Sequence, residues 1–179
     1  MTTKTLLVLG GARSGKSRYA QHLAETSGAR PVLIATAQAH DAEMRARIAR
    51  HAAERGPNWT VVEEPHALAK ALAREAQPGR VVVVDCATLW LSNLMLREAD
   101  LAKASAELAG ALKVLGGPAI LVSNEVGGGI VPENALARRF RDAQGSLNQA
   151  LAGVCEAVVV MQAGIPVRIK PGSEPKFRF

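Results

Sequence analysis

The segment Gly10–Ser17 reads GGARSGKS, and it constrains the fold more than any other part of the chain. It fits the pattern G-x-x-x-x-G-K-S, follows the apolar run Thr5–Leu9 and precedes the helical pattern Arg18–Glu25. A glycine-rich turn between a strand and a helix lets successive backbone N–H groups point at phosphate oxygens, beside the positive end of the helix. A chance match in a glycine-rich turn is the alternative. The strand and helix patterns on its two sides argue against that alternative.

Two side chains in this segment suit the phosphates of a nucleoside triphosphate. Lys16 can place a point charge on the β- and γ-phosphates, and the Ser17 hydroxyl can be a ligand of Mg²⁺. We therefore expect the chain to bind a nucleoside triphosphate. The residues expected to surround its phosphates are Gly10, Gly11, Ala12, Arg13, Ser14, Gly15, Lys16 and Ser17.

Length and composition indicate one folded domain. The chain has 179 residues, of which 48% are apolar but only 3% aromatic, so aliphatic side chains must fill its core. A charged fraction of 21% without low-complexity tracts argues against disorder. We expect a single catalytic domain over residues 1–170. The prolines of Pro171–Pro175 predict a loose C-terminal tail over residues 171–179.

Charge, hydropathy and cysteine spacing exclude several classes. The net charge is +6, but the basic residues are scattered, so we expect no nucleic-acid partner. The longest apolar runs fall far short of the ~20 residues that span a membrane, and no signal peptide is evident. Cys86 and Cys155 have no metal or redox spacing, which favours unpaired core thiols and a cytoplasmic location.

Apolar, β-branched segments alternate with helical patterns along the chain. The strand candidates are Leu6–Leu9, Pro31–Ala35, Trp59–Glu63, Val81–Val84, Ala119–Ser123, Ala157–Met161 and Ile165–Ile169. The helix candidates are Lys16–Thr26, Asp41–Glu54, His66–Ala76, Leu89–Leu96, Leu101–Leu115 and Asn134–Gly153. This alternation predicts an α/β fold of the P-loop NTPase type, with a doubly wound, mostly parallel sheet. The short link between the last two strands predicts a hairpin at one sheet edge.

Asp85 ends the apolar run Val81–Val84. A carboxylate at the end of a buried strand is typical of a group that faces Mg²⁺ beside the phosphate loop. An Asp at this place is as often a helix cap, here before Ala87–Leu91. The phosphate loop favours the metal interpretation, while Glu63, which ends another strand candidate, is ambiguous in the same way.

His51 is the most discriminating residue after the loop. Arg47, His51 and Arg55 are spaced by four, so they would form one stripe on the expected helix Asp41–Glu54. An imidazole between two guanidiniums suits a phosphoryl or nucleotidyl group, which the histidine attacks while the arginines hold its oxygens. Spacing alone nevertheless favours an arginine-rich face turned to solvent. The other histidines, His22, His40 and His66, have no comparable setting.

A second loop follows the strand candidate that ends at Ser123. Residues 123–132 read SNEVGGGIVP, where three glycines permit close approach to a ligand and Asn124 and Glu125 supply polar contacts. The basic segment Arg138–Asp142 then lies near the start of a helix. A flexible connector with a solvated helix remains the alternative.

These segments together resemble the bifunctional adenosylcobinamide kinase/adenosylcobinamide-phosphate guanylyltransferase family of cobalamin biosynthesis. The resemblance runs to about Lys170. It rests on GGARSGKS, Ile34–Thr36, the region from Glu43 to Trp59 with His51 and Arg55, Glu63, Asp85, NEVGGGIVP, Arg138–Asp142, Gly145 and Asn148–Gln149. The form GGARSGKS joined to NEVG-x-GIVP is far more specific than a phosphate loop alone.

The resemblance implies two reactions and a homotrimer. The γ-phosphate of ATP or GTP passes to a hydroxyl of adenosylcobinamide, and GMP from GTP is then joined to that phosphate, releasing pyrophosphate. His51 would carry GMP covalently, with Lys16 as the second catalytic residue and Ser17 and Asp85 at Mg²⁺. The nucleotide contacts implied beyond the loop are Ile34, Ala35, Thr36, Ala52, Ala53, Glu54, Arg55, Glu63 and Asp85.

Three other functions remain to be compared with this one. Another small-molecule kinase would share the loop but would not need the stripe around His51. A regulatory GTPase is disfavoured, because Asp85 begins Asp-Cys-Ala-Thr rather than D-x-x-G and residues 123–126 are not N-K-x-D. A nucleotide-regulated nucleic-acid-binding module would use the basic charge and show salt-sensitive oligonucleotide binding.

Overall fold

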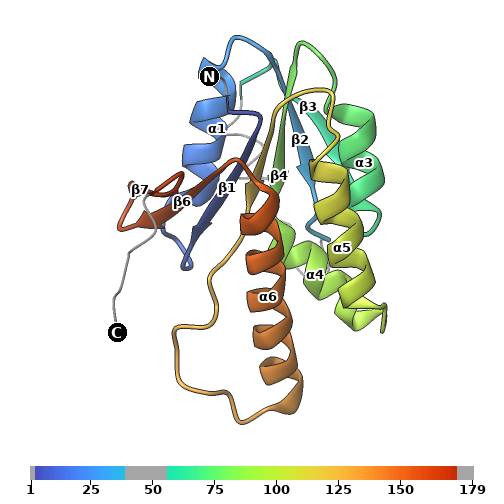
Figure 1. Ribbon diagram of the computed structural model, residues 1–179, viewed down its shortest axis with the longest axis vertical. Helices are drawn as coiled ribbons and strands as arrows, with labels where there is room; N and C mark the ends of the chain where they lie inside the picture. Colours follow the sequence, from blue (N-terminus) through green and yellow to red (C-terminus); the bar gives the residue numbers. More distant parts are fainter. Residues whose placement is uncertain (1–2, 39–55, 173–179) are drawn as a thin grey trace, which may run out of the picture.

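The computed structural model describes residues 3–38 and 56–172 (Figure 1). Its sheet has seven strands in the order β3-β2-β4-β5-β1-β6-β7. The strands are β1 (Thr5–Gly10), β2 (Arg30–Ala35), β3 (Thr60–Glu63), β4 (Arg80–Asp85), β5 (Ala119–Val122), β6 (Ala157–Gln162) and β7 (Ile165–Lys170). The helices are α1 (Lys16–Thr26), α3 (Leu68–Glu75), α4 (Ala87–Leu96), α5 (Leu101–Leu112) and α6 (Ala135–Val154).

Six of the strands are parallel, and β7 alone runs antiparallel, against β6. The turn between β6 and β7 places Ala163 at φ 50° and Gly164 at φ 82°, which suits a two-residue hairpin turn. The predicted doubly wound sheet and its C-terminal edge hairpin are both confirmed.

Alternate residues of the central strands enter two separate apolar cores. Val8 packs with α1 on one face, while Leu7 and Leu9 pack with α3, α4, α5 and α6 on the other (Figure 1). All four valines of Val81–Val84 are buried, as a parallel strand covered on both faces requires. Cys86 and Cys155 lie in these cores and no disulfide links them, as the sequence predicts.

The starts of α4 and α3 each differ from the predicted starts by two residues. Cys86 is extended at the N-cap of α4, and its Sγ accepts a hydrogen bond from the Leu89 N–H, so α4 begins at Ala87 rather than Leu89. The Glu64 carboxylate accepts the N–H groups of His66 and Ala67, and α3 begins only at Leu68. The Cys86 side chain caps α4, whereas the Glu64 side chain orders the two residues before α3, and Ala67, the N-cap of α3, makes no side-chain cap.

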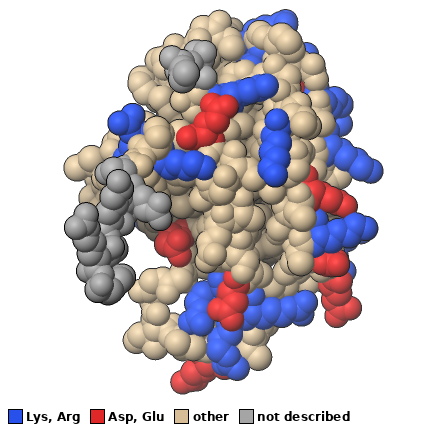
Figure 2. Space-filling model, in the orientation of Figure 1, with Lys and Arg blue, Asp and Glu red and all other residues tan. Residues whose placement is uncertain are grey.

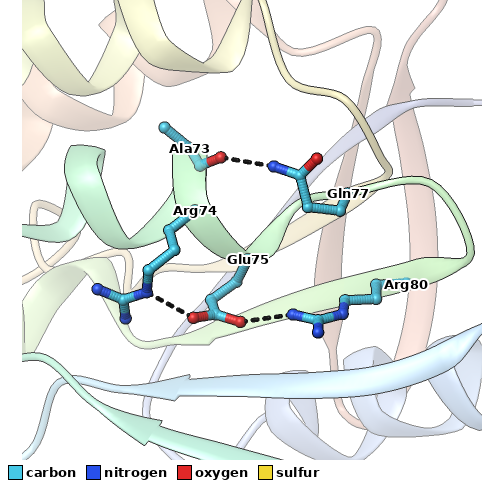
Figure 3. A network of polar contacts seen from close by, with 5 residues as sticks. All are labelled: Ala73, Arg74, Glu75, Gln77 and Arg80. Carbon is cyan, nitrogen blue, oxygen red and sulfur yellow. Dashed lines mark hydrogen bonds and ion pairs between the residues drawn. The ribbon is translucent and has the colours of Figure 1, made fainter.

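An ion-pair network lies at the amino-terminal end of β4 (Figure 3). The carboxylate of Glu75, at the end of α3, lies 2.7 Å from Arg74 Nε and 2.8 Å from Arg80 Nη1. The amide of Gln77 donates to the Ala73 carbonyl in the same turn. Arg80 is the first residue of β4, so this network joins α3 to the strand that carries Asp85 at its other end.

Candidate active site

The phosphate loop has the backbone that its glycines predict. Gly10 ends β1 at φ 149°, and Gly15 is the N-cap of α1 at φ 93°, in the left-handed region. A Cβ on Gly10 would lie 2.7 Å from the Met161 carbonyl oxygen and 2.7 Å from Ser14 Oγ. Only glycine fits there, because the loop runs directly against β6.

Two neighbouring segments hold this loop from its two sides. The Glu125 N–H donates to the Gly10 carbonyl at 3.0 Å, from the segment that follows β5. The Gly164 N–H donates to the Ser14 carbonyl at 3.2 Å, from the β6–β7 turn. The loop is therefore shaped by chain segments more than a hundred residues away as well as by its own glycines.

Lys16 lies in the first turn of α1 with only 6% of its surface exposed, and its Nζ donates to the Gly11 carbonyl at 2.6 Å. The ammonium group of Lys16 therefore lies against the backbone at the start of the loop. Ser14 Oγ is buried and has no hydrogen-bond partner. A buried hydroxyl without a partner is costly in a folded protein, and a phosphate oxygen would satisfy it. The loop is suited to an anion.

The strand register places the predicted contacts along one edge of the sheet. Val8 pairs with Val122, Val122 with Asp85, Asp85 with Ala35, and Ala35 with Glu63. Val8, Val122, Asp85, Ala35 and Glu63 therefore lie in one row across the sheet, near the carboxyl ends of their strands. In β1 this row lies two residues before the phosphate loop begins. Asp85 and Glu63 reach the edge that carries the loop, and β5 separates Asp85 from β1.

The implied contacts Ile34, Ala35 and Thr36 lie at the end of β2, at this edge, and the half-buried Ala35 side chain packs against the core on the α1 face. The Ile34 side chain is buried in the core. The Thr36 hydroxyl donates to the Cys86 carbonyl at 2.7 Å and accepts the Cys86 N–H at 2.9 Å. These two hydrogen bonds join the residue after β2 to the residue after β4, and no sequence pattern predicts them.

The capping interpretation of Asp85 is wrong, because Cys86 is the N-cap of α4. The Asp85 carboxylate is thereby left for another role. A serine hydroxyl, one carboxylate and the oxygens of a bound phosphate form the kind of donor set that Mg²⁺ takes in nucleotide sites. Ser17, half-buried beside Lys16, and Asp85, half-buried at the same sheet edge, fit that set. Within residues 3–38 and 56–172, His, Cys, Asp and Glu form no separate metal-binding cluster.

A buried polar network behind this edge was missed by the sequence reasoning. Ser123 Oγ donates to Asn148 Oδ1 at 2.7 Å and accepts from Gln144 Nε2 at 2.9 Å, and all three residues are at least 95% buried. Asn148 Nδ2 donates to the Asn124 carbonyl, and the Asn124 N–H donates to Thr88 Oγ1. The network ties α6 to the start of the loop 124–134. The only signal in the sequence is two amides four residues apart on a helix.

The predicted stripe around His51 lies outside the described residues. The same holds for Arg47 and for the implied contacts Ala52, Ala53, Glu54 and Arg55. These residues remain predictions. His22 and His66, by contrast, are described, and neither lies along the line of strand ends: His22 is exposed on α1, and the His66 carbonyl accepts the indole N–H of Trp90.

Two side chains near these elements have shifted pKa values. Hydrogen bonds from the Ala67 and His66 N–H groups and nearby positive charges lower the pKa of Glu64, against the opposing effect of its burial. Burial raises the pKa of the Cys155 thiol to about 11. Cys155 is therefore a neutral thiol near pH 7, which fits a core residue.

Figure 2 shows basic and acidic side chains interspersed over one face of the molecule. Basic side chains gather in its lower part, where Figure 1 places the start of α6. The first two turns of α6 carry Arg138, Arg139 and Arg141. No helix among residues 3–38 and 56–172 has the length and hydropathy to cross a membrane.

Known structures with the same overall fold include a recombinase and an ATPase. The RadB recombinase superposes with a TM-score of 0.53 at 15% identity, over 87% of this chain and 73% of its own. An ATPase of a bacterial type III secretion system gives 0.55 at 10% identity, over 88% of this chain and 50% of its own. A protein of Pyrococcus horikoshii OT3 superposes with a TM-score of 0.56 at 10% identity, over 96% of this chain and 90% of its own. These likenesses concern the fold alone.

Sequence relatives are much closer. The chain is 51% identical to the bifunctional adenosylcobalamin biosynthesis protein CobP of Pseudomonas aeruginosa, over 92% of this chain and 96% of the relative. It is 38% identical to the bifunctional adenosylcobalamin biosynthesis protein CobU of Escherichia coli, over 92% of this chain and 99% of the relative. The model of the family cobinamide kinase / cobinamide phosphate guanyltransferase matches residues 6–169. The predicted resemblance is confirmed, and the chain belongs to the cobinamide kinase / cobinamide phosphate guanyltransferase family.

Proposed function

We propose that this chain phosphorylates adenosylcobinamide with ATP or GTP and then transfers GMP from GTP to the product, giving adenosylcobinamide-GDP and pyrophosphate. The observation that carries the proposal is the register of the sheet. It brings Asp85 and Glu63 to the edge where the phosphate loop holds Lys16. The family membership and the relatives named for adenosylcobalamin biosynthesis support the choice of substrate.

In the kinase step, the loop binds the triphosphate and holds its γ-phosphate toward the hydroxyl of the substrate. Lys16 places its charge on the β- and γ-phosphates, where negative charge is redistributed as the bond to the leaving group breaks. Ser17 and Asp85 would hold Mg²⁺, which supplies further charge neutralisation when bound. The hydroxyl oxygen attacks the γ-phosphorus and the nucleoside diphosphate leaves.

In the guanylyl transfer step, the α-phosphorus of GTP is the electrophile. A ring nitrogen of His51 attacks it, a nitrogen–phosphorus bond forms, and pyrophosphate leaves. A phosphate oxygen of adenosylcobinamide phosphate then attacks the same phosphorus and frees the histidine. The phosphate loop can serve both steps, since it binds the β- and γ-phosphates in each. Arg47 and Arg55 would hold the α-phosphate oxygens.

The test is incubation with α-labelled and γ-labelled GTP, with and without adenosylcobinamide. Wild type should acquire acid-labile GMP from the α-label and pass the γ-label to adenosylcobinamide. His51→Ala should lose the covalent GMP but keep the kinase step, and His66→Ala serves as the matched control. Acid-labile GMP on His51→Ala would refute the assignment. Kinase activity without any covalent GMP on wild type would point to the alternative, a small-molecule kinase without guanylyl transfer.

We also propose that residues 1–170 form one catalytic domain, followed by a tail over 171–179, and that the enzyme is a cytoplasmic homotrimer without a nucleic-acid partner. Exposed apolar side chains support an oligomer: Ile165, Val167 and Ile169 on the edge strand β7, and Ile130, which is 98% exposed. Light scattering coupled to size-exclusion chromatography measures the oligomeric state. A monomer at micromolar concentration would contradict this part of the proposal.

A further inference from the structure

A cavity of about 330 Å³ adjoins the phosphate loop on the side of the β6–β7 hairpin. It is lined by Gly15, Arg18, Tyr19, His22, Met161 and Gly164. Three of these side chains come from the first two turns of α1. Its volume falls within the range of about 300–1,000 Å³ that is usual for small-molecule sites. Neither the predicted site nor the reactions proposed above use this cavity.

The cavity shares Gly15 with the phosphate loop, which fixes what can reach it. The phosphates of a bound triphosphate lie against the loop, so the ribose and base must lie close to it. A larger cavity of about 470 Å³ lies among α3, α4 and α5, and no loop residue lines it. Of these two cavities, only the smaller one can receive a base from a triphosphate on this loop.

The wall of the cavity is held to the loop. The Gly164 N–H donates to the Ser14 carbonyl at 3.2 Å, and a Cβ on Gly15 would lie 3.6 Å from Gly164 Cα. Met161, at the end of β6, is buried and forms part of the floor. The hairpin is thus a fixed boundary of the phosphate site rather than a separate surface element.

The lining has the chemistry of a nucleoside site. Tyr19 is aromatic and half-buried, so it offers a flat base a surface to stack on, and the buried Met161 adds a polarisable side chain to the lining. Arg18 and His22 are exposed one turn apart on α1, and no acidic residue lines the cavity. Stacking accepts any base, because every base has a π-face. The cavity is therefore suited to both adenine and guanine.

We propose that this cavity binds the base and ribose of the phosphoryl donor in the kinase step. The implied nucleotide contacts Glu63 and Asp85 lie on the other side of β1, beyond β5. One phosphate loop would then serve two base sites. The hairpin-side site would accept the base of ATP or GTP by stacking, and the base of GTP in guanylyl transfer would lie on the side of β4 and β2. This inference rests on the proposed function.

The experiment measures KM for ATP in the kinase reaction and KM for GTP in guanylyl transfer to adenosylcobinamide phosphate, for wild type and variants. Tyr19→Leu should raise the KM for ATP about tenfold or more, by loss of a stacking surface, with kcat changed less than threefold. Tyr19→Phe should restore it. Arg18→Gln and His22→Ala should each raise it severalfold. All four should leave the KM for GTP in guanylyl transfer within twofold of wild type.

The control Arg97→Gln removes the same charge at the larger cavity and should leave the KM for ATP unchanged. Inhibition by tripolyphosphate should be the same in every protein, because it probes the phosphate loop alone. If Tyr19→Leu does not fold, the exposed sites Arg18 and His22 decide the question. Unchanged KM for ATP, or an equal rise in both KM values, overturns the inference. Absence of both activities from wild type would instead overturn the proposed function.

Discussion

Ser123 Oγ lies 2.7 Å from Asn148 Oδ1, and this hydrogen bond joins the end of β5 to the middle of α6. Both residues are buried, and Gln144 Nε2 lies 2.9 Å from each of the same two oxygens. The Asn148 amide also holds the Asn124 carbonyl at 3.0 Å. Because Glu125, the next residue, binds Gly10, this pair sets the position of one side of the phosphate loop.

Asn148→Ala should therefore destabilise the protein. It removes the acceptor of Ser123 and the donor to Asn124, and buried polar groups without partners cost about 1–3 kcal/mol each. We expect the free energy of unfolding in urea to fall by that order. Gln149→Ala, at the exposed neighbouring position, is the control and should change it by less than about 0.5 kcal/mol. Equal effects of the two variants would contradict the structural role of Asn148.

Gly10→Ala should also destabilise the protein, for a steric reason. The new Cβ would lie 2.7 Å from the Met161 carbonyl oxygen at φ 149°, so β6 or the loop must move. We expect a loss of about 1–3 kcal/mol in the free energy of unfolding, together with weaker nucleotide binding. Gly11→Ala is the matched control, since a Cβ there meets nothing within 4 Å. Thermal unfolding of both variants compares them directly, and a Gly10→Ala protein as stable as Gly11→Ala would rule out the close approach.

Lys16→Ala should lower both activities. Its ammonium group is positioned over the loop, 2.6 Å from the Gly11 carbonyl, and both proposed reactions place the β- and γ-phosphates there. Loss of one such stabilising charge typically costs about 10²–10³ in kcat. The exposed Lys103 provides the control Lys103→Ala, which should retain both rates. A normal kinase rate in Lys16→Ala would exclude the loop from phosphoryl transfer.

The strands and the phosphate loop could be predicted from the sequence because local pattern determines them. Val81–Val84 is apolar at every position, and GGARSGKS carries its own backbone requirements. The network of Ser123, Gln144 and Asn148 could not be predicted, since its members meet only after α6 docks on β5. On the helix alone, Gln144 and Asn148 resemble solvent-facing amides.

Contacts that form only after the strands and helices pack also explain why the cap of α4 and the hydrogen bonds of Thr36 could not be predicted. Asp is a common N-cap, which makes a cap the alternative interpretation of Asp85, whereas an extended Cys86 takes that position. The hydroxyl of Thr36 bonds Cys86, and such pairing depends on strand order; the nucleotide contact of Thr36 stays a prediction. The role of His51 stays a prediction, on residues outside those described.

Glu64 gives the chain a pH-dependent element of stability. Its carboxylate accepts the N–H groups of Ala67 and His66, and these bonds with nearby positive charges hold its pKa below the ordinary value of 4.5. A carboxylate with a lowered pKa stabilises the folded state above its unfolded-state pKa, and this contribution is lost as the pH falls through the folded-state value.

Glu64→Gln should therefore lower the free energy of unfolding at pH 7 by up to about 1 kcal/mol, because a neutral amide oxygen accepts the His66 and Ala67 N–H groups less strongly than a carboxylate does. The gap between wild type and variant should narrow below pH 4.5, where the carboxylate becomes protonated in both states. In an Ala67→Pro background, which lacks one of the donors, the same substitution should have a smaller effect. Urea unfolding at pH 7 and pH 3 measures both differences. A gap that widens at pH 3 would show that the charge of Glu64 does not stabilise the start of α3.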